Sequence, residues 1–161
     1  MRTVPFEAVA RSVEETREVG RELSLLLVPG SVVRLSGPLG AGKTELVRGL
    51  AEGLGVLPDE VASPTFALVH EYGPEGRPPL LVHVDFYRLL DDERLGAAIE
   101  GLGLDETRED GSVVVVEWPE GLPATPGDFE VIVTPERDGA RRIEVRRAPV
   151  ESGSRGGLRR R

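Results

Sequence analysis

The stretch Gly37-Pro38-Leu39-Gly40-Ala41-Gly42-Lys43-Thr44 decides the fold of this chain, because it matches the phosphate-binding pattern G-x-x-x-x-G-K-[ST]. Lys43 is the only lysine among the 161 residues, and arginine supplies every other basic side chain. An ammonium is a compact point charge that suits a tight phosphate cradle, whereas the planar guanidinium fork does not fit the same space. A lysine kept at this one position indicates phosphate binding and not an ordinary glycine-rich turn.

The sequence on both sides of this phosphate loop (residues 37–44) predicts the strand and the helix that the pattern requires. Residues 31–36 read as a buried, β-branched strand, and residues 44–54 carry apolar side chains at helical spacing. In this arrangement the glycines let backbone N–H groups converge on phosphate oxygens, and the helix N-terminus adds a partial positive charge. The expected roles are Lys43 on the β- and γ-phosphates and the Thr44 hydroxyl on Mg²⁺.

The remaining segments predict a single α/β domain. We expect a P-loop NTPase-like three-layer sandwich whose central sheet is mostly parallel and ends in a C-terminal β-hairpin. We expect a short strand in residues 2–9, followed by a helix that Ser12 and Glu15 cap and whose apolar face carries Val19, Leu23, Leu26 and Leu27. Further strands are expected at residues 66–72, 80–85 and 112–118, and a helix around 93–100. Residues 128–134 and 141–147 are expected to form a hairpin. No repeat or linker marks a second domain. We therefore expect one domain over residues 1–150 and a disordered, arginine-rich tail over residues 151–161.

Composition limits the chemistry and the compartment. The absence of cysteine excludes disulfides, zinc thiolate sites and thiol nucleophiles. The net charge of −8 makes the chain a poor platform for extensive nucleic-acid contact, so we expect no binding to DNA. Charged residues interrupt any signal-peptide core, and no apolar run approaches the length of a membrane span. We expect a cytoplasmic protein without membrane contact.

Two carboxylates end apolar runs. Leu81-Val82-His83-Val84 leads into Asp85, and the four valines of residues 113–116 lead into Glu117. Open α/β sheets bind ligands at the carboxyl ends of their strands, so both acids are expected at the phosphate site. A nucleotide hydrolase needs one acid on the metal and a group that orients the attacking water. Asp85 and Glu117 are therefore candidate catalytic and metal residues, and their spacing does not decide which takes which role.

Three other features lie near these motifs. Ser63-Pro64-Thr65 follows the phosphate-loop helix, where GTPase-like proteins carry a threonine that senses the γ-phosphate through Mg²⁺, and the alternative is a plain turn. Trp118, the only tryptophan, either packs at a strand end or positions Glu117 or contacts a partner. His70 and His83 lack metal-ligand spacing and are interpreted as packed or surface residues.

Four motifs occur in order along the chain: the phosphate loop, Ser63-Pro64-Thr65, His83-Val84-Asp85-Phe86-Tyr87-Arg88-Leu89 and Val116-Glu117-Trp118-Pro119. Together they resemble the TsaE (YjeE) family, over roughly residues 8–147. This is a family of small bacterial P-loop ATPases needed for the threonylcarbamoyladenosine modification of tRNA. The resemblance implies binding of ATP, ADP and Mg²⁺ and slow ATP hydrolysis. It also implies action with TsaD and TsaB, which transfer the threonylcarbamoyl group to the adenosine beside the anticodon. The implied role is to reset that complex between turnovers, so tRNA is reached only indirectly.

The resemblance also assigns residues. In relatives the metal is held by the threonine matching Thr44 and the acid matching Glu117, and the acid matching Asp85 is also important. Positions near Val13 and near Gly139 approach the adenine in relatives.

Two positions of the phosphate loop and its helix depart from the family pattern. Pro38 stands where relatives often have aspartate, and Glu45 where they often have a second threonine. Glu45 adds a negative charge beside the phosphate site, although an acid in the first turn of a helix is favourable in itself.

Two other functions fit the same loop. A small-molecule or nucleoside kinase usually closes an arginine-bearing lid over the phosphates, and residues 91–110, with Arg94 and Arg108, are the candidate lid. A nucleotide-gated scaffold would bind ATP and hardly hydrolyse it alone. A rise in hydrolysis on adding partner proteins separates the scaffold from a stand-alone enzyme.

Overall fold

Strand β5 (Val113–Glu117) is buried along its whole length and pairs in parallel with β2 (Val32–Ser36) on one side and β4 (Leu81–Asp85) on the other. A strand covered on both faces reads as a continuous apolar run, which explains its four consecutive valines. The structure is a computed structural model that describes residues 2–149. The strongest apolar run in the sequence therefore forms the middle of the sheet.

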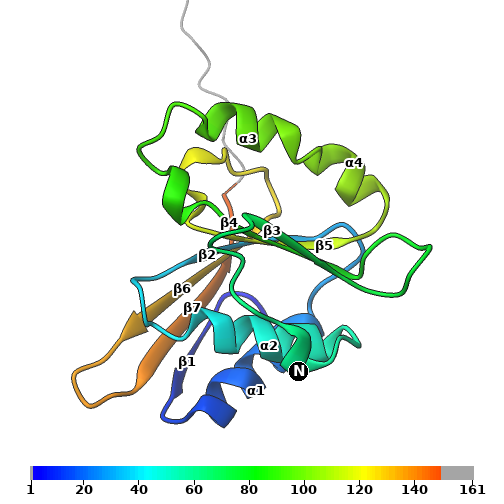
Figure 1. Cartoon of the computed structure of the whole chain (residues 1–161). Helices are drawn as coiled ribbons and strands as arrows, with labels where there is room; N and C mark the ends of the chain where they lie inside the picture. Colours follow the sequence, from blue (N-terminus) through cyan, green and yellow to red (C-terminus); the bar gives the residue numbers. More distant parts are fainter. Residues whose placement is uncertain (1, 150–161) are drawn as a thin grey trace, which may run out of the picture.

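In residues 2–149 seven strands form one sheet in the order β1-β7-β6-β2-β5-β4-β3 (Figure 1). Strand β6 (Phe129–Pro135) is parallel to β2, so the four middle strands share one direction. The outer strands β1 (Phe6–Ala10), β7 (Arg141–Arg147) and β3 (Val69–Tyr72) run antiparallel to their neighbours. The expected parallel centre and the C-terminal hairpin of β6 and β7 are confirmed.

The helices cover both faces of this sheet (Figure 1). Helices α1 (Val13–Ser24) and α2 (Lys43–Gly53) pack on one face, over an apolar cluster that includes Leu23 and Leu46. Helices α3 (Leu95–Gly101) and α4 (Leu104–Glu109) lie on the other face, over a second apolar cluster. Single 3₁₀ turns connect these elements at η1 (Pro58–Glu60), η2 (Tyr87–Leu89) and η3 (Pro119–Gly121). The three-layer arrangement is as expected.

Glycine lets α1 and α2 approach closely. A Cβ atom on Gly49 of α2 would lie 1.9 Å from the carbonyl oxygen of Arg17 in α1, and one on Gly20 would lie 2.2 Å from the carbonyl oxygen of Leu46. Any larger residue would push the helices apart. This close crossing fixes α2, and with it the phosphate loop, against α1.

Two predicted elements differ from the observed ones, and one observed helix was not predicted. The predicted strand at residues 66–72 begins only at Val69, because Leu68 takes a left-handed backbone with φ of 66° and its N–H donates to the Pro64 carbonyl at 2.6 Å. Helix α1 ends at Ser24, so Leu26 and Leu27 pack on the core from the loop that follows. The helix predicted around residues 93–100 is present as α3, and after Gly103, which turns the chain with φ of 56°, comes α4, a helix that was not predicted.

Two further expectations concern the ends of the chain and membrane contact. The tail at residues 151–161 lies outside the described residues, as do residues 1 and 150 of the expected domain. Among residues 2–149, no helix combines the length and the apolar character needed to cross a bilayer.

Candidate functional site

The phosphate loop joins the carboxyl end of β2 to the first turn of α2. Gly40 and Gly42 take φ values of 76° and 100°, in the left-handed region that favours glycine. Within the loop, the Ala41 N–H donates to the Pro38 carbonyl at 3.1 Å, which closes a tight turn. The strand, glycine loop and helix therefore have the order and the backbone conformation that phosphate binding requires.

Lys43 is folded over this loop and is only 6% exposed. Its Nζ donates to the Gly37 carbonyl and lies 4.2 Å from the centre of the Trp118 ring. Burial lowers the pKa of Lys43, and the negative charges of Glu117 and Asp85 oppose that shift. The single lysine of the chain thus lies between its own loop, an aromatic face and two carboxylates.

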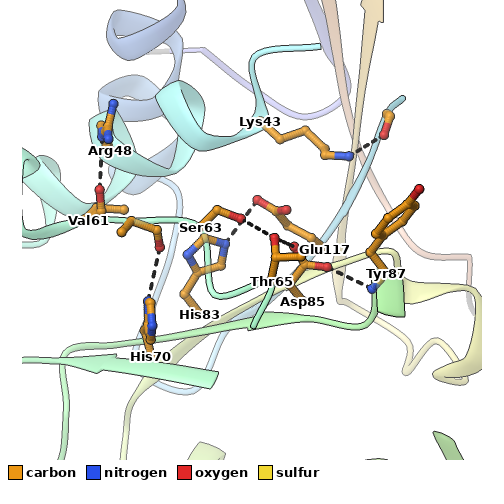
Figure 2. Close-up of polar contacts among 12 residues, drawn as sticks. Lys43, Arg48, Val61, Ser63, Thr65, His70, His83, Asp85, Tyr87 and Glu117 are labelled. Atoms are coloured by element: carbon orange, nitrogen blue, oxygen red, sulfur yellow. Dashed lines mark hydrogen bonds and ion pairs between the residues drawn. The ribbon is translucent and has the colours of Figure 1, made fainter. Parts of the chain in front are cut away.

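Asp85 and Glu117 end neighbouring strands and are paired directly in the parallel register of β4 and β5. Both residues are 3% exposed, and their side chains lie together beneath the phosphate loop (Figure 2). Oδ1 of Asp85 accepts from the Tyr87 N–H at 2.8 Å, and Oδ2 accepts from the Thr65 hydroxyl at 3.2 Å. Burial raises the pKa of Asp85 and the charge of Glu117 raises it further, while the Tyr87 and Thr65 hydrogen bonds oppose the rise.

His83 holds Glu117 from below. It lies two residues before Asp85 on β4 and points to the same face, because side chains alternate along a strand. Its Nε2 donates to Oε1 of Glu117 at 3.1 Å, since a carboxylate can only accept (Figure 2). Its Nδ1 is buried without a hydrogen-bond partner in the described residues. The interpretation of His83 as a packed residue is correct but incomplete, because it positions a site carboxylate.

The segment Ser63-Pro64-Thr65 reaches the two strand ends from the side of α2. The Ser63 and Thr65 hydroxyls lie 2.8 Å apart, and Thr65 donates to Asp85 (Figure 2). The base of the segment is tied to α2, because Nε of Arg48 donates to the Val61 carbonyl at 3.1 Å. The segment is therefore more than a surface turn, since its threonine contacts a candidate catalytic acid.

One cavity of about 280 Å³ unites these groups. It is lined by Leu39, Gly40, Ala41, Gly42, Lys43, Thr44, Glu45, Ser63, Thr65, Asp85, Tyr87, Glu117 and Trp118. Gly37 and Pro38 contribute through their carbonyls, which accept from Lys43 and Ala41. The structure thus brings together the phosphate-loop residues, both carboxylates and Thr65.

Val13 and Gly139, the positions expected near adenine, do not line this cavity. Val13 opens α1 and is exposed, and Gly139 lies in the turn between β6 and β7. The two regions are nevertheless adjacent, because Nη1 of Arg11 pairs with Oδ2 of Asp138 at 2.7 Å. They form one edge of the molecule.

The oxygen groups of the cavity suit Mg²⁺. A magnesium ion is usually held by one or two carboxylates and completes its shell with waters and substrate phosphates. The Thr44 hydroxyl, Glu117 and Asp85 offer such a set, all of oxygen and all on one cavity. Within residues 2–149, no group of three or more His, Asp or Glu side chains forms a complete protein cage. A shared, partly hydrated ion therefore fits this site better than an all-protein metal centre.

Glu45 lines the cavity but is neutralised. Its two oxygens pair with Nε of Arg17 at 2.7 Å and with Nη1 of Arg48 at 2.5 Å. The charge that this departure from the family pattern introduces is therefore compensated locally.

Sequence reasoning missed two contacts with this site. Tyr87 lines the cavity and donates its N–H to Asp85, and its place in the D-x-Y-R-L block was the available signal. Arg141 donates from Nε to the Ala41 carbonyl at 2.8 Å, across 100 residues of sequence. No local pattern marks that contact.

Comparisons with known proteins identify the family. The family model described as "Threonylcarbamoyl adenosine biosynthesis protein TsaE" matches residues 10–143. This chain belongs to the TsaE family. It therefore combines the phosphate-loop nucleotide-binding fold with membership of a family of tRNA threonylcarbamoyladenosine biosynthesis.

Individual TsaE relatives agree with the family assignment. A "tRNA threonylcarbamoyladenosine biosynthesis protein TsaE" of Streptomyces coelicolor is 53% identical over 108 residues, which are 65% of this chain and 68% of the relative. A TsaE protein of Nostoc sp. is 40% identical over 82% of this chain and 80% of its own length. The crystal structure of Bacillus subtilis YdiB superposes with a TM-score of 0.65 at 29% identity, covering 92% of this chain and 89% of that one.

Proposed function

We propose that this protein binds Mg²⁺-ATP in the cavity below the phosphate loop, hydrolyses it slowly, and acts with TsaD and TsaB to reset their threonylcarbamoyl-transfer complex between turnovers. The observation that carries the proposal is the meeting of Lys43, Thr44, Thr65, Asp85 and Glu117 on one cavity. These are the groups that phosphoryl chemistry needs, namely a phosphate cradle, a metal-binding hydroxyl, and acids for metal and water.

Lys43 supplies the positive charge for the phosphates. In the free protein its ammonium is occupied by the Gly37 carbonyl and the Trp118 ring. Phosphate oxygens are stronger, charge-assisted acceptors than a carbonyl, so the lysine turns to the β- and γ-phosphates when ATP enters. The loop N–H groups and the N-terminus of α2 add to this attraction.

The two acids take different roles. Glu117, held by His83, and the Thr44 hydroxyl are assigned to the metal. Asp85, held by Tyr87 and Thr65, is assigned to the attacking water, because its raised pKa favours accepting a hydrogen bond from it. Bound Mg²⁺ would neutralise charge that develops on the β- and γ-phosphates. The water oxygen bonds to the γ-phosphorus as the bond to the β–γ bridging oxygen breaks, which gives ADP and phosphate.

The arginines of the candidate kinase lid do not lie at the phosphate-loop cavity. Nη2 of Arg94 pairs with Oδ2 of Asp92 at 2.7 Å, and Nη1 of Arg108 lies 3.7 Å from Oδ1 of Asp128. Both arginines belong to the layer of α3 and α4, and neither lines the phosphate-loop cavity. The scaffold reading stays compatible with the proposal, since slow hydrolysis alone and faster hydrolysis with partners describe both.

The test is ATP hydrolysis by the purified chain, measured alone and with TsaD and TsaB from the same source. We expect little turnover alone and a clear rise with the two partners. Strong turnover that is independent of partners, or phosphate transfer to a nucleoside, would contradict the proposal.

Two variants test the residue assignments. Glu117→Ala should fold and lose partner-stimulated turnover, and normal turnover would refute the role of this acid. Lys43→Ala should lose ATP affinity, and unchanged binding in a titration calorimeter would refute the phosphate cradle. Glu75→Ala, which changes an exposed acid outside the cavity, is the control for both.

A further inference from the structure

Arg141 connects the C-terminal hairpin to the phosphate loop. It opens β7, and its side chain lies on the same face as Ile143, which is buried under α1 and α2. Its Nε donates to the Ala41 carbonyl at 2.8 Å, and its Nη1 donates to the Gly139 carbonyl at 3.2 Å. One guanidinium therefore joins the loop to the hairpin turn.

The loop is built to receive this side chain. A Cβ atom on Gly42 would lie 2.7 Å from Nε of Arg141 and 2.9 Å from its Cδ. Gly42 thus serves two purposes, because its φ of 100° favours glycine and its missing side chain leaves room for the arginine. The contact is a packed interface and not a chance surface approach.

The contact fixes the direction of a loop amide. The Ala41 carbonyl and the Gly42 N–H belong to one planar trans peptide unit, in which they point in opposite directions. A guanidinium that holds the carbonyl toward the hairpin therefore holds the N–H away from the hairpin. Gly42 is one of the residues that line the cavity, whereas Arg141 is not. Backbone N–H groups in such glycine loops are the donors that bind phosphate oxygens.

We propose that Arg141 is a positioning residue of the phosphate loop. By holding the Ala41 carbonyl, Arg141 orients the Gly42 N–H toward a phosphate group. The inference rests on the proposed nucleotide binding and adds a residue to its machinery. Arg141 acts through the loop, because it does not line the cavity and two of its donors already have carbonyl acceptors.

The role needs the geometry of arginine. The fixed fork of a guanidinium spans two acceptors at once, whereas a lysine ammonium is a single point at the end of a flexible stem. Arg141→Met keeps a stem of similar length and removes every donor, and Arg141→Lys keeps one donor group. The neighbouring Arg142 is a matched control, because it pairs with Glu136 at 2.6 Å and with Glu7 on the opposite face of the strand.

Affinities separate a phosphate-loop role from an adenine contact. Titration calorimetry with Mg²⁺ measures the affinities for ADP and for pyrophosphate. In Arg141→Met we expect both affinities to fall by the same factor of roughly tenfold, as for loss of a hydrogen bond from a charged donor. Arg141→Lys should recover part of that loss, and Arg142→Met should bind both probes as the parent does. Unchanged affinities in Arg141→Met, or weaker ADP with unchanged pyrophosphate, would overturn the proposal.

A second readout does not depend on the proposed function. In the nucleotide-free protein, ¹⁵N relaxation should report a rigid Gly42 amide, with an order parameter near 0.85 that falls below about 0.6 in Arg141→Met and not in Arg142→Met. An equally ordered Gly42 amide in both variants would contradict the role of Arg141. A parent protein that binds neither ADP nor pyrophosphate would instead contradict the proposed nucleotide binding.

Discussion

Asp85 lowers the stability of the nucleotide-free protein at neutral pH. Burial and the neighbouring charge of Glu117 raise its pKa. A carboxyl with a raised folded-state pKa contributes stability that is present below its unfolded pKa and is lost as pH rises through the folded pKa. The ionised form of Asp85 therefore opposes folding at neutral pH when no cation is bound. Stability is given up here for a reactive group.

This cost can be measured with Asp85→Asn. In magnesium- and nucleotide-free buffer we expect a higher Tm than the parent at pH 7, with the difference shrinking as the pH falls toward about 4, the ordinary pKa of an aspartate. Scanning calorimetry across this pH range is the measurement. Asp92→Asn is the control, and we expect it to lower the Tm at pH 7, because Arg94 lowers the pKa of Asp92 to about 2. A lower Tm for Asp85→Asn at pH 7 would sink the argument.

Glu45 should matter little for ATP affinity. Its charge is already paired with Arg17 and Arg48, so little net negative field reaches the phosphates. We expect Glu45→Thr to change the Kd for ATP by less than about tenfold, or roughly 1.4 kcal/mol. A calorimetric titration that gives a larger gain in affinity would show that the two arginines do not neutralise it.

At the residue scale, the arrangement of the candidate site could be predicted from the sequence where the signal was local. The phosphate loop, Asp85 and Glu117 were predicted to lie together because each belongs to a contiguous pattern of a few residues, and the structure places them on one cavity. The contact of Arg141 with Ala41 was not found, because 100 residues separate them and only the sheet order brings them together. His83 was noticed, but its bond to Glu117 depends on the parallel register of β4 and β5.

At the scale of elements, the crossing of α1 and α2 depends on two glycines. The backbone of each helix fills the space where the other would carry a side chain. Interiors packed this closely respond to a single added methyl group.

Two glycine-to-alanine changes in helices should have opposite signs. Gly49→Ala in α2 should lower the free energy of unfolding by about 1–3 kcal/mol, because its Cβ meets the Arg17 carbonyl. Gly96→Ala in α3 should raise it by about 0.5–1 kcal/mol, because no heavy atom lies within 4 Å of that Cβ and alanine favours helix. Urea denaturation measures both. A loss of stability in both variants would mean that helix crowding is not the deciding factor.

The C-terminal end of α1 was predicted too late, and the start of β3 was missed at a left-handed turn. Periodicity located the strands and helices well, since most are amphipathic or fully apolar. It placed the start of β3 too early, because Leu68 adopts a left-handed conformation that a leucine rarely takes. That conformation shapes the turn which delivers Thr65 to Asp85, so local propensity failed at a place where the site overrides it.

At the scale of the whole molecule, nucleotide binding should couple to global stability. The site draws on the phosphate loop, two central strands and the segment around Thr65, all of which must be folded to form it. At an ATP concentration of 100 times Kd, with Mg²⁺, binding should stabilise the fold by about 2.7 kcal/mol. For a chain of this length that corresponds to a rise in Tm of about 5–10 °C.

Thermal unfolding with and without Mg²⁺-ATP tests this coupling. Lys43→Ala should lose most of the rise at the same ATP concentration, whatever its own Tm. Arg146→Ala, which breaks only the surface pair with Glu130, should keep it. An equal rise in the parent and in Lys43→Ala would place the nucleotide elsewhere.

The chain has one lysine and one tryptophan, and the ammonium of Lys43 rests over the indole ring of Trp118. A cation held against an aromatic face interacts with its π electrons, and that interaction changes when the cation leaves. Because no other indole contributes, ultraviolet emission from the unlabelled protein reports on this one contact. Departure of the ammonium toward a phosphate becomes an optical event, which can be followed in a stopped-flow cell on the timescale of a single turnover.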